Sequence, residues 1–88
     1  IEILQNHNFN HIINQNKYNY IQEKIYLNYI DHYIDTKSQN DILNLDLNDN
    51  RFKLNIYSKS LDNNQTQYDI FIKSTDNSNI RTYMQKIK

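Results

Sequence analysis

The chain has 88 residues, and its ten basic and ten acidic side chains give a formal net charge of zero. It contains no Cys, Gly or Pro, which excludes disulfides, thiolate metal sites and the glycine-rich loops that cradle phosphate groups. Balanced charge provides no long-range attraction to nucleic acid or an anionic membrane, and no apolar run approaches the ~20 residues of a membrane span.

A chain of this length builds one hydrophobic core, so we expect a single small domain over residues 1–88. The chain is asparagine-rich and also lacks Ala and Val, a composition that indicates an AT-rich genome. Without Gly, turns that need a positive φ fall to Asn or Asp. Because the chain opens on Ile1 rather than Met, we expect an excerpt or fragment of a longer protein. Composition does not indicate its compartment.

Two helices are predicted in the first half. Helical spacing of Phe9, Ile12 and Ile13 favours a short helix that begins near His7, with Asn6 as its cap. A second helix is predicted from Lys17 to Asp35. Its apolar stripe consists of Tyr18, Ile21, Ile25 and Tyr29, widened by Tyr26, Ile30 and Tyr33, which leaves Gln22, Glu23, Asn28 and Asp31 toward solvent.

The pattern then changes to strict alternation of apolar and polar residues. Three segments alternate: Leu43–Leu47, Phe52–Ile56 and Tyr68–Ile72. Such segments are typical of an antiparallel sheet that is covered on one face. The first turn is either a two-residue turn of Asn48 and Asp49, a four-residue loop to Arg51, or a three-residue loop with a bulge. A longer second connection is expected over residues 60–65.

A last helix is predicted from the spacing of Ile80, Tyr83, Met84 and Ile87. Asp76 or Ser78 would cap its start, and Lys86 and Lys88 would lie near its C-terminus, where the helix dipole favours cations. The predicted fold class is therefore α+β, with N-terminal helices, a three-stranded antiparallel β-meander and a C-terminal helix.

The residues that most often carry chemistry do not form a recognisable site. His7 and His11 have the i, i+4 spacing of zinc ligands, but no third ligand is nearby and no Glu lies between them. His32 is interpreted as a solvent-facing helix residue. Five serines, Ser38, Ser58, Ser60, Ser74 and Ser78, fall in connections without a recognisable catalytic context. We expect no catalytic, cofactor-binding or metal-ligating residues, no cofactor and no enzymatic activity.

Two further features have structural interpretations. Asp46 and Asp69 fall on the polar face of the predicted sheet, where pairing with Lys53 or Lys73 accounts for them. The sequon Asn64-Gln65-Thr66 lies in the predicted second connection and matters only if the protein is secreted.

The tyrosines leave two interpretations open. Rings exposed on the long helix would form a protein-contact surface, because Tyr is enriched at interfaces. Alternatively, Tyr fills core positions in a chain without Val, Ala or Trp. These residues are Tyr18, Tyr20, Tyr26, Tyr29 and Tyr33. The leading hypothesis is a non-catalytic protein–protein interaction domain or a subunit of a larger complex, with a protein partner.

Two alternatives remain. The predicted α-β-β-β-α order over Lys17 to Lys88 is similar in topology to the double-stranded-RNA-binding domain, which implies an RNA-binding module. That family uses a Gly-Pro turn and a Lys-rich start of its last helix, where this chain has Asn48-Asp49-Asn50 and Asn79-Ile80-Arg81-Thr82. A local basic stripe of Lys53, Lys59, Lys73, Arg81 and Lys86 would bind the nucleic acid. The other alternative is a processed propeptide or inhibitor segment.

Overall fold

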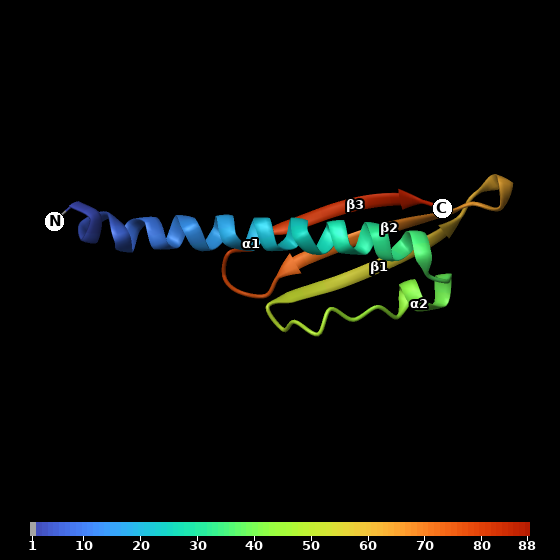
Figure 1. The fold of residues 1–88 in the computed structure, drawn as a ribbon, viewed down its shortest axis with the longest axis horizontal. Coiled ribbons are helices and arrows are strands. Elements are labelled where there is room, and N and C mark those ends of the chain that lie inside the picture. The colour runs from blue at the N-terminus through green and yellow to red at the C-terminus, as the bar shows by residue number, and fades with distance from the viewer. Residues whose placement is uncertain (1) are drawn as a thin grey trace.

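The computed structural model describes the backbone of residues 2–88 and the side chains of residues 15–88. Helix α1 (Glu2–Thr36) and the short α2 (Gln39–Leu43) precede strands β1 (Phe52–Ser60), β2 (Thr66–Ser74) and β3 (Arg81–Ile87) (Figure 1). The strands form one antiparallel sheet in the order β1-β2-β3. The predicted α+β class and the three-stranded antiparallel sheet are confirmed.

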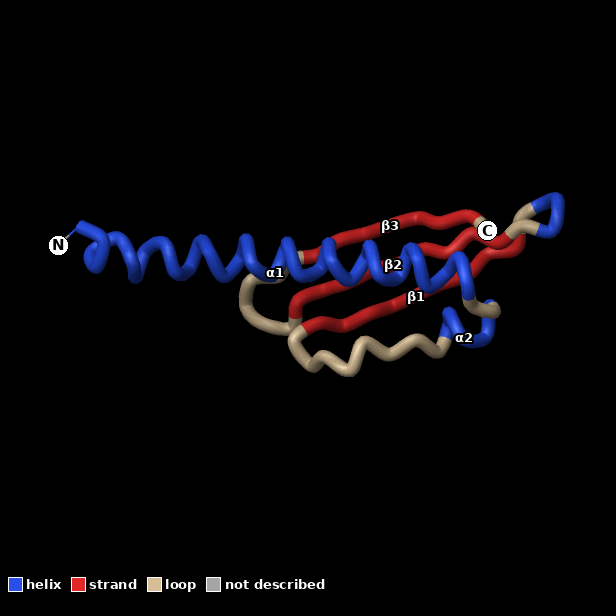
Figure 2. Tube along the Cα trace, in the orientation of Figure 1, coloured by secondary structure: helices blue, strands red, loops and turns tan. Residues whose placement is uncertain are grey.

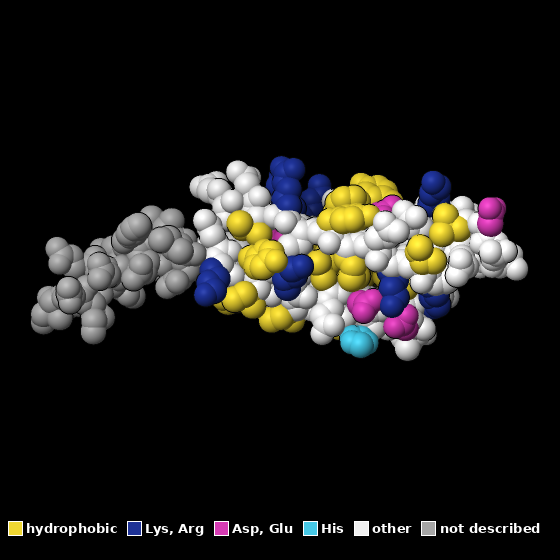
Figure 3. Space-filling model, turned by 90° about the horizontal axis from the view of Figure 1, so that it is seen from above, with side chains coloured by type: hydrophobic (Ala, Val, Ile, Leu, Met, Phe, Trp, Pro, Cys, Tyr) yellow, Lys and Arg dark blue, Asp and Glu magenta, His cyan; other side chains and the backbone are white. Residues whose placement is uncertain are grey.

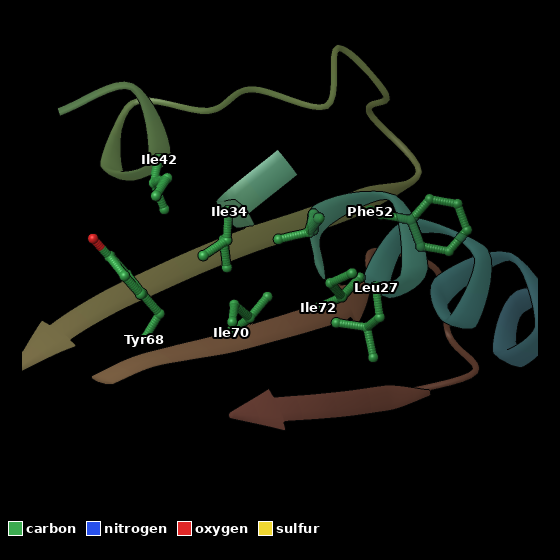
Figure 4. Close-up of a cluster of buried hydrophobic side chains, with 8 residues drawn as sticks. Leu27, Ile34, Ile42, Phe52, Tyr68, Ile70 and Ile72 are labelled. Carbon is green, nitrogen blue, oxygen red and sulfur yellow. The ribbon is translucent and has the colours of Figure 1, made fainter. Parts of the chain in front are cut away.

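The molecule has two layers, with α1 lying across one face of the sheet (Figure 2). No helix of the described residues covers the other face, which we call the outer face. The core lies between the layers, where side chains of α1 and α2 meet the inner face of β1 and β2 (Figure 4). Its buried members are Leu27, Ile30, Ile34, Ile42, Phe52, Tyr68, Ile70 and Ile72.

Helix α1 is continuous, so the two separate N-terminal helices of the sequence prediction are wrong. Residues 14–17 contain no Gly or Pro and lack a strong helix breaker. Asn6 therefore lies inside the helix rather than at a cap. The residue after β3 binds the C-terminal end of α1. Lys88 Nζ donates to the carbonyl oxygens of Ile34 (2.6 Å) and Lys37 (2.8 Å).

The face of α1 that meets the sheet differs from the predicted one. Asn19 and Glu23 are buried together with Leu27, Ile30 and Ile34, which follow them at helical spacing. Glu23 was predicted to face solvent, yet it is fully buried. Part of the predicted stripe is correct, since Tyr26, Ile30 and Tyr33 pack in or against the core. The rest is wrong, because its members are exposed: Tyr18, Ile21, Ile25 and Tyr29. Hydrophobic periodicity gives polar residues no weight and therefore misplaced the buried face. Here, two polar residues belong to the buried stripe since β2, β3 and the connection between these strands supply their partners.

The first predicted strand, 43–47, is also wrong. Leu43 ends α2, and the residues after it run in extended form toward β1 without ladder pairing. Leu45 and Leu47 still pack against the core, while Asn44 and Asp46 are exposed. Alternation thus identified the inward side chains correctly for Leu45 and Leu47 but not for Leu43, which is exposed. It could not indicate whether the backbone pairs with a neighbouring strand.

The predicted C-terminal helix is wrong as well, since the segment forms β3 and pairs with β2. This also removes the topological similarity to the double-stranded-RNA-binding domain. The segment alternates as a strand, but its inward residues Thr82 and Lys86 are polar and hide the pattern. Both have partners on α1: Thr82 contacts Glu23, and Lys86 contacts Asp31 and Asp35.

Asparagine takes the turn positions that Gly usually occupies, as predicted. Within residues 2–88, the residues with positive φ are Asn48, Asn63, Asn64 and Asn79. Asn63 and Asn64 form the connection between β1 and β2, which the sequence placed correctly. Asn48 precedes β1 but does not close a hairpin, because the segment before it is not a strand.

Candidate functional site

The side of α1 that points away from the sheet carries a row of exposed apolar side chains. These are Tyr18, Ile21, Ile25 and Tyr29, each between 46% and 55% exposed. The row follows i, i+3 and i+4 spacing, so its members lie on one helix face. We call Tyr18, Ile21, Ile25 and Tyr29 the helix row. In Figure 3, hydrophobic side chains are visible at the surface of the molecule, with Lys and Arg side chains beside them.

A hollow of about 430 Å³ borders the helix row. It lies between α1 and the extended segment before β1, and its lining includes Ile25, Tyr29 and Leu47. Tyr26 also lines it and is half-buried, packed against the core beside Phe52 with ring centroids 5.5 Å apart. The helix row therefore adjoins a recess that is partly apolar.

A second group of polar side chains joins α1 to the end of the sheet where β2 is connected to β3, and its members on α1 are buried. Thr82 Oγ1 donates to Glu23 Oε1 at 3.0 Å, and the Ser74 hydroxyl donates to Glu23 Oε2. One turn earlier, Asn19 Nδ2 donates to Asp76 Oδ2 at 2.6 Å and to Ser78 Oγ at 3.1 Å. These contacts fasten the middle of α1 to β2, β3 and the connection between them.

This buried group has no arrangement suited to nucleophilic catalysis. The Ser74 hydroxyl is buried, and its partner is a carboxyl that Thr82 also contacts, so substrate cannot reach it. Ser38 caps α2 by accepting from the Asp41 N–H at 3.3 Å, and Ser78 bonds to Asp76. Among the side chains that the structure describes, no group of three His, Asp or Glu residues could hold a metal ion.

Asp49 forms a polar cluster beside the hollow. Its carboxylate accepts hydrogen bonds from Arg51 Nε (2.9 Å), from an Arg51 terminal nitrogen (2.7 Å) and from the Tyr26 hydroxyl. Arg51 above all, and then Tyr26, hold the pKa of Asp49 well below its ordinary value. The same bond to Asp49 raises the pKa of Tyr26. The cluster joins α1 to the start of β1.

The depressed pKa of Asp49 predicts a loss of stability in acid. The carboxylate stabilises the fold fully above its unfolded-state pKa of about 3.9, and the contribution disappears as pH falls toward the lower folded-state pKa. Asp49→Asn should cost at most about 1 kcal/mol at pH 7, since Arg51 is exposed and solvent screens the pair. Urea unfolding at pH 7 and pH 3 checks this. If Asp49→Asn lost as much stability between pH 7 and pH 3 as the original protein, the Asp49 carboxylate would not be a source of the acid sensitivity.

The outer face of the sheet carries exposed aromatic and basic side chains. The Tyr57 and Phe71 rings lie edge to face with centroids 5.8 Å apart, and Phe71 and Tyr83 are 4.9 Å apart. The Tyr83 hydroxyl donates to Asp69 at 2.7 Å, and this bond raises the pKa of Tyr83. Lys53 opposes Lys73 on the adjacent strand, which in turn opposes Arg81.

The structure separates the residues of the predicted basic stripe. Lys53, Lys59, Lys73 and Arg81 fall on the outer face by strand alternation. Lys86 lies on the inner face, where it is 2.8 Å from Asp31 Oδ1 and 3.1 Å from Asp35 Oδ1, contacts that raise its pKa. Lys86 is therefore not part of one stripe with the others.

Other predicted residues have the following places. Asp69 accepts bonds from Tyr83 and Gln67, and Asp46 from the Asn48 N–H, so the predicted pairing with Lys53 or Lys73 is wrong. His32 is exposed on α1, and Asn64 is exposed between β1 and β2. His7 and His11 lie outside the residues whose side chains are described.

The tyrosines are divided between the core and the surface. Tyr26 and Tyr33 pack against the core, whereas Tyr18, Tyr20 and Tyr29 are exposed. Sequence reasoning missed the outer aromatic group because it assigned Tyr83 to a helix. The alternation of β2 could have indicated one ring of this group, because it places Phe71 on the sheet face away from Ile70 and Ile72.

Comparisons with models of protein families, with curated proteins and with solved structures found no match. Among the helices of the described residues, none combines the length and the apolar character that crossing a membrane requires.

Proposed function

We propose that this chain is a non-catalytic protein-interaction domain that binds an amphipathic helix of another protein along the helix row. The observation that carries the proposal is the row itself: four large apolar side chains, each about half exposed, on one face of α1. The opposite face of α1 already packs on the sheet. A helix that is apolar on two sides is typically covered on both.

The grouping of four exposed apolar side chains on one helix face supports a protein partner. Single apolar residues scattered over a surface are ordinary, whereas contiguous exposed apolar patches often mark interaction sites. Tyr18 and Tyr29 at the ends of the row add rings that contribute contact area at low cost in conformational entropy.

The adjoining hollow supports a helical partner in particular. Helix-in-groove recognition uses apolar side chains at i, i+3 or i+4 and i+7, one of which anchors in a recess. The 430 Å³ hollow beside Ile25 and Tyr29 can receive such an anchor. Its exposed acidic residue, Asp46, would favour a basic residue next to that anchor.

Selection from a displayed library of amphipathic helical peptides tests the proposal. We expect selected peptides to carry an apolar i, i+3, i+7 pattern and to lose at least about tenfold in affinity for Ile25→Asp, because an unpaired charge in an apolar contact costs more than 1.4 kcal/mol. Circular dichroism should show an intact fold, since Ile25 is 55% exposed.

Tyr29→Ala and Tyr20→Ala form a matched pair of variants. Both tyrosines are about half exposed on α1, but Tyr20 lies off the helix row. Only Tyr29→Ala should weaken peptide binding. Equal effects of the two variants, or peptides insensitive to Ile25→Asp, would contradict the proposal. Dimerisation of the chain through the row, seen by sedimentation, would assign the row to a second copy instead.

A further inference from the structure

The outer face places three cations in direct opposition. Lys53 is paired with Lys73, and Lys73 with Arg81, so the three side chains form one line across the strands. Like charges directly opposite each other destabilise a sheet. Among residues 15–88, none of the three has an ion pair or a side-chain hydrogen bond. The arrangement opposes folding and favours an anionic ligand.

Aromatic rings lie immediately next to this line of cations. The next register row contains Phe71 and Tyr83, with Asn55 opposite Phe71 on β1. Tyr57 completes the group of rings, and the three rings are between 42% and 58% exposed. Exposed rings on an open sheet face provide flat surfaces on which planar groups can stack.

A hollow of about 280 Å³ lies where the cations meet the rings. Asn55, Phe71, Lys73 and Arg81 are among its lining residues. A flat group stacked on Phe71 would therefore have the Asn55 amide and two cations next to it. Asp69, the acidic residue of this face, lies beyond the rings and is bonded to Tyr83 and Gln67.

We propose that the outer face of the sheet binds single-stranded nucleic acid, with Lys53, Lys73 and Arg81 contacting phosphates and Phe71 stacking on a base. The two halves of the site require different chemistry from one ligand: anionic groups for the cations and flat rings for the aromatics. A single strand offers both, whereas a duplex keeps its bases stacked inside. An acidic peptide satisfies only the cations. The site is on the opposite side of the molecule from the helix row and is independent of it.

Fluorescence anisotropy with a labelled oligouridylate of about ten nucleotides tests the proposal. We expect binding at low ionic strength that weakens as salt rises, with a slope of about −0.7 per phosphate contacted. Phe71→Ala should weaken binding roughly 5- to 150-fold, which corresponds to the loss of one stacked base. Lys73→Gln should weaken binding and reduce the salt slope by about 0.7.

Thermal unfolding without ligand separates this proposal from a merely structural role of Lys73. Because Lys73 lies between two cations, Lys73→Gln should raise the midpoint of unfolding while it weakens binding. The control Lys17→Gln removes the same charge from α1 and should change neither quantity. Tyr20→Ala is the matched control for the lost ring, since Tyr20 on α1 is 48% exposed and Phe71 is 42% exposed.

Three outcomes would overturn the proposal. One is absence of binding at low ionic strength, where phosphate contacts are strongest. Another is equal binding of duplex and single strand with no effect of Phe71→Ala, which indicates attraction of charge alone. The third is equally tight binding of polyglutamate, which would assign the cations to an acidic peptide. Equal binding of the RNA and of the matching oligodeoxythymidylate supports the proposal.

Discussion

Ile30→Ala should lower the free energy of unfolding by about 2–5 kcal/mol, because it opens a cavity in a tightly packed core. Ile25→Ala should change it by no more than about 0.5 kcal/mol. The two isoleucines lie five positions apart on α1 and look alike to sequence periodicity. Ile30 is 0% exposed against the sheet, whereas Ile25 is 55% exposed on the helix row.

Urea unfolding of the two variants measures this difference directly. Equal losses would place α1 in a different rotation on the sheet and would remove the basis of the helix row. The expected result has a functional meaning as well: if Ile25 contributes little to the stability of the isolated domain, its apolar side chain is left for contact with a partner.

Glu23→Leu should destabilise the fold by about 2–5 kcal/mol. The substitution leaves the hydroxyls of Ser74 and Thr82 buried without their acceptor, and each unsatisfied group costs about 1–3 kcal/mol. Glu23→Gln retains an oxygen acceptor at the same place and should cost less. Chemical denaturation at pH 7 of the original protein, Glu23→Gln and Glu23→Leu measures this order of stability.

A combined variant tests whether the cost arises from the unsatisfied hydroxyls. Adding Ser74→Ala and Thr82→Val to Glu23→Leu replaces the carboxyl and its two hydroxyl partners with apolar side chains. We expect most of the lost stability to return, since buried polar networks are often replaceable as a unit. A triple variant as unstable as Glu23→Leu alone would show that packing, rather than hydrogen bonding, requires the carboxyl.

Several features were available from the sequence because they depend on local chemistry. Alternation in Phe52–Ile56 and Tyr68–Ile72 predicted β1 and β2, since one face of each strand is apolar and the other polar. Asparagine replaced Gly at the positive-φ positions because, in a chain without Gly, it tolerates that region best. The amphipathic stretch from residue 17 to 35 predicted most of α1.

The partners of polar residues were decided by the tertiary structure. Thr82 and Lys86 face inward because α1 supplies their partners across the interface. Glu23 accepts from Thr82, and Asp31 and Asp35 pair with Lys86. Their polarity concealed the strand pattern of β3, and the apolar residues left over happened to fit a helix. In the same way, the groups that accept from Asn19 and those that donate to Glu23 lie more than fifty residues away in sequence.

The two candidate surfaces, the helix row and the outer face of the sheet, also depend on tertiary contacts that local sequence does not reveal. Composition by itself excluded thiols and glycine-rich loops, and the periodicity of the apolar residues by itself predicted the α+β class. Only the tertiary structure decided which apolar side chains enter the core, because polar pairing on α1 turns the helix and leaves the helix row outside. Strand register likewise aligned Lys53, Lys73 and Arg81 beside Phe71, and register depends on pairing between segments that no single segment encodes.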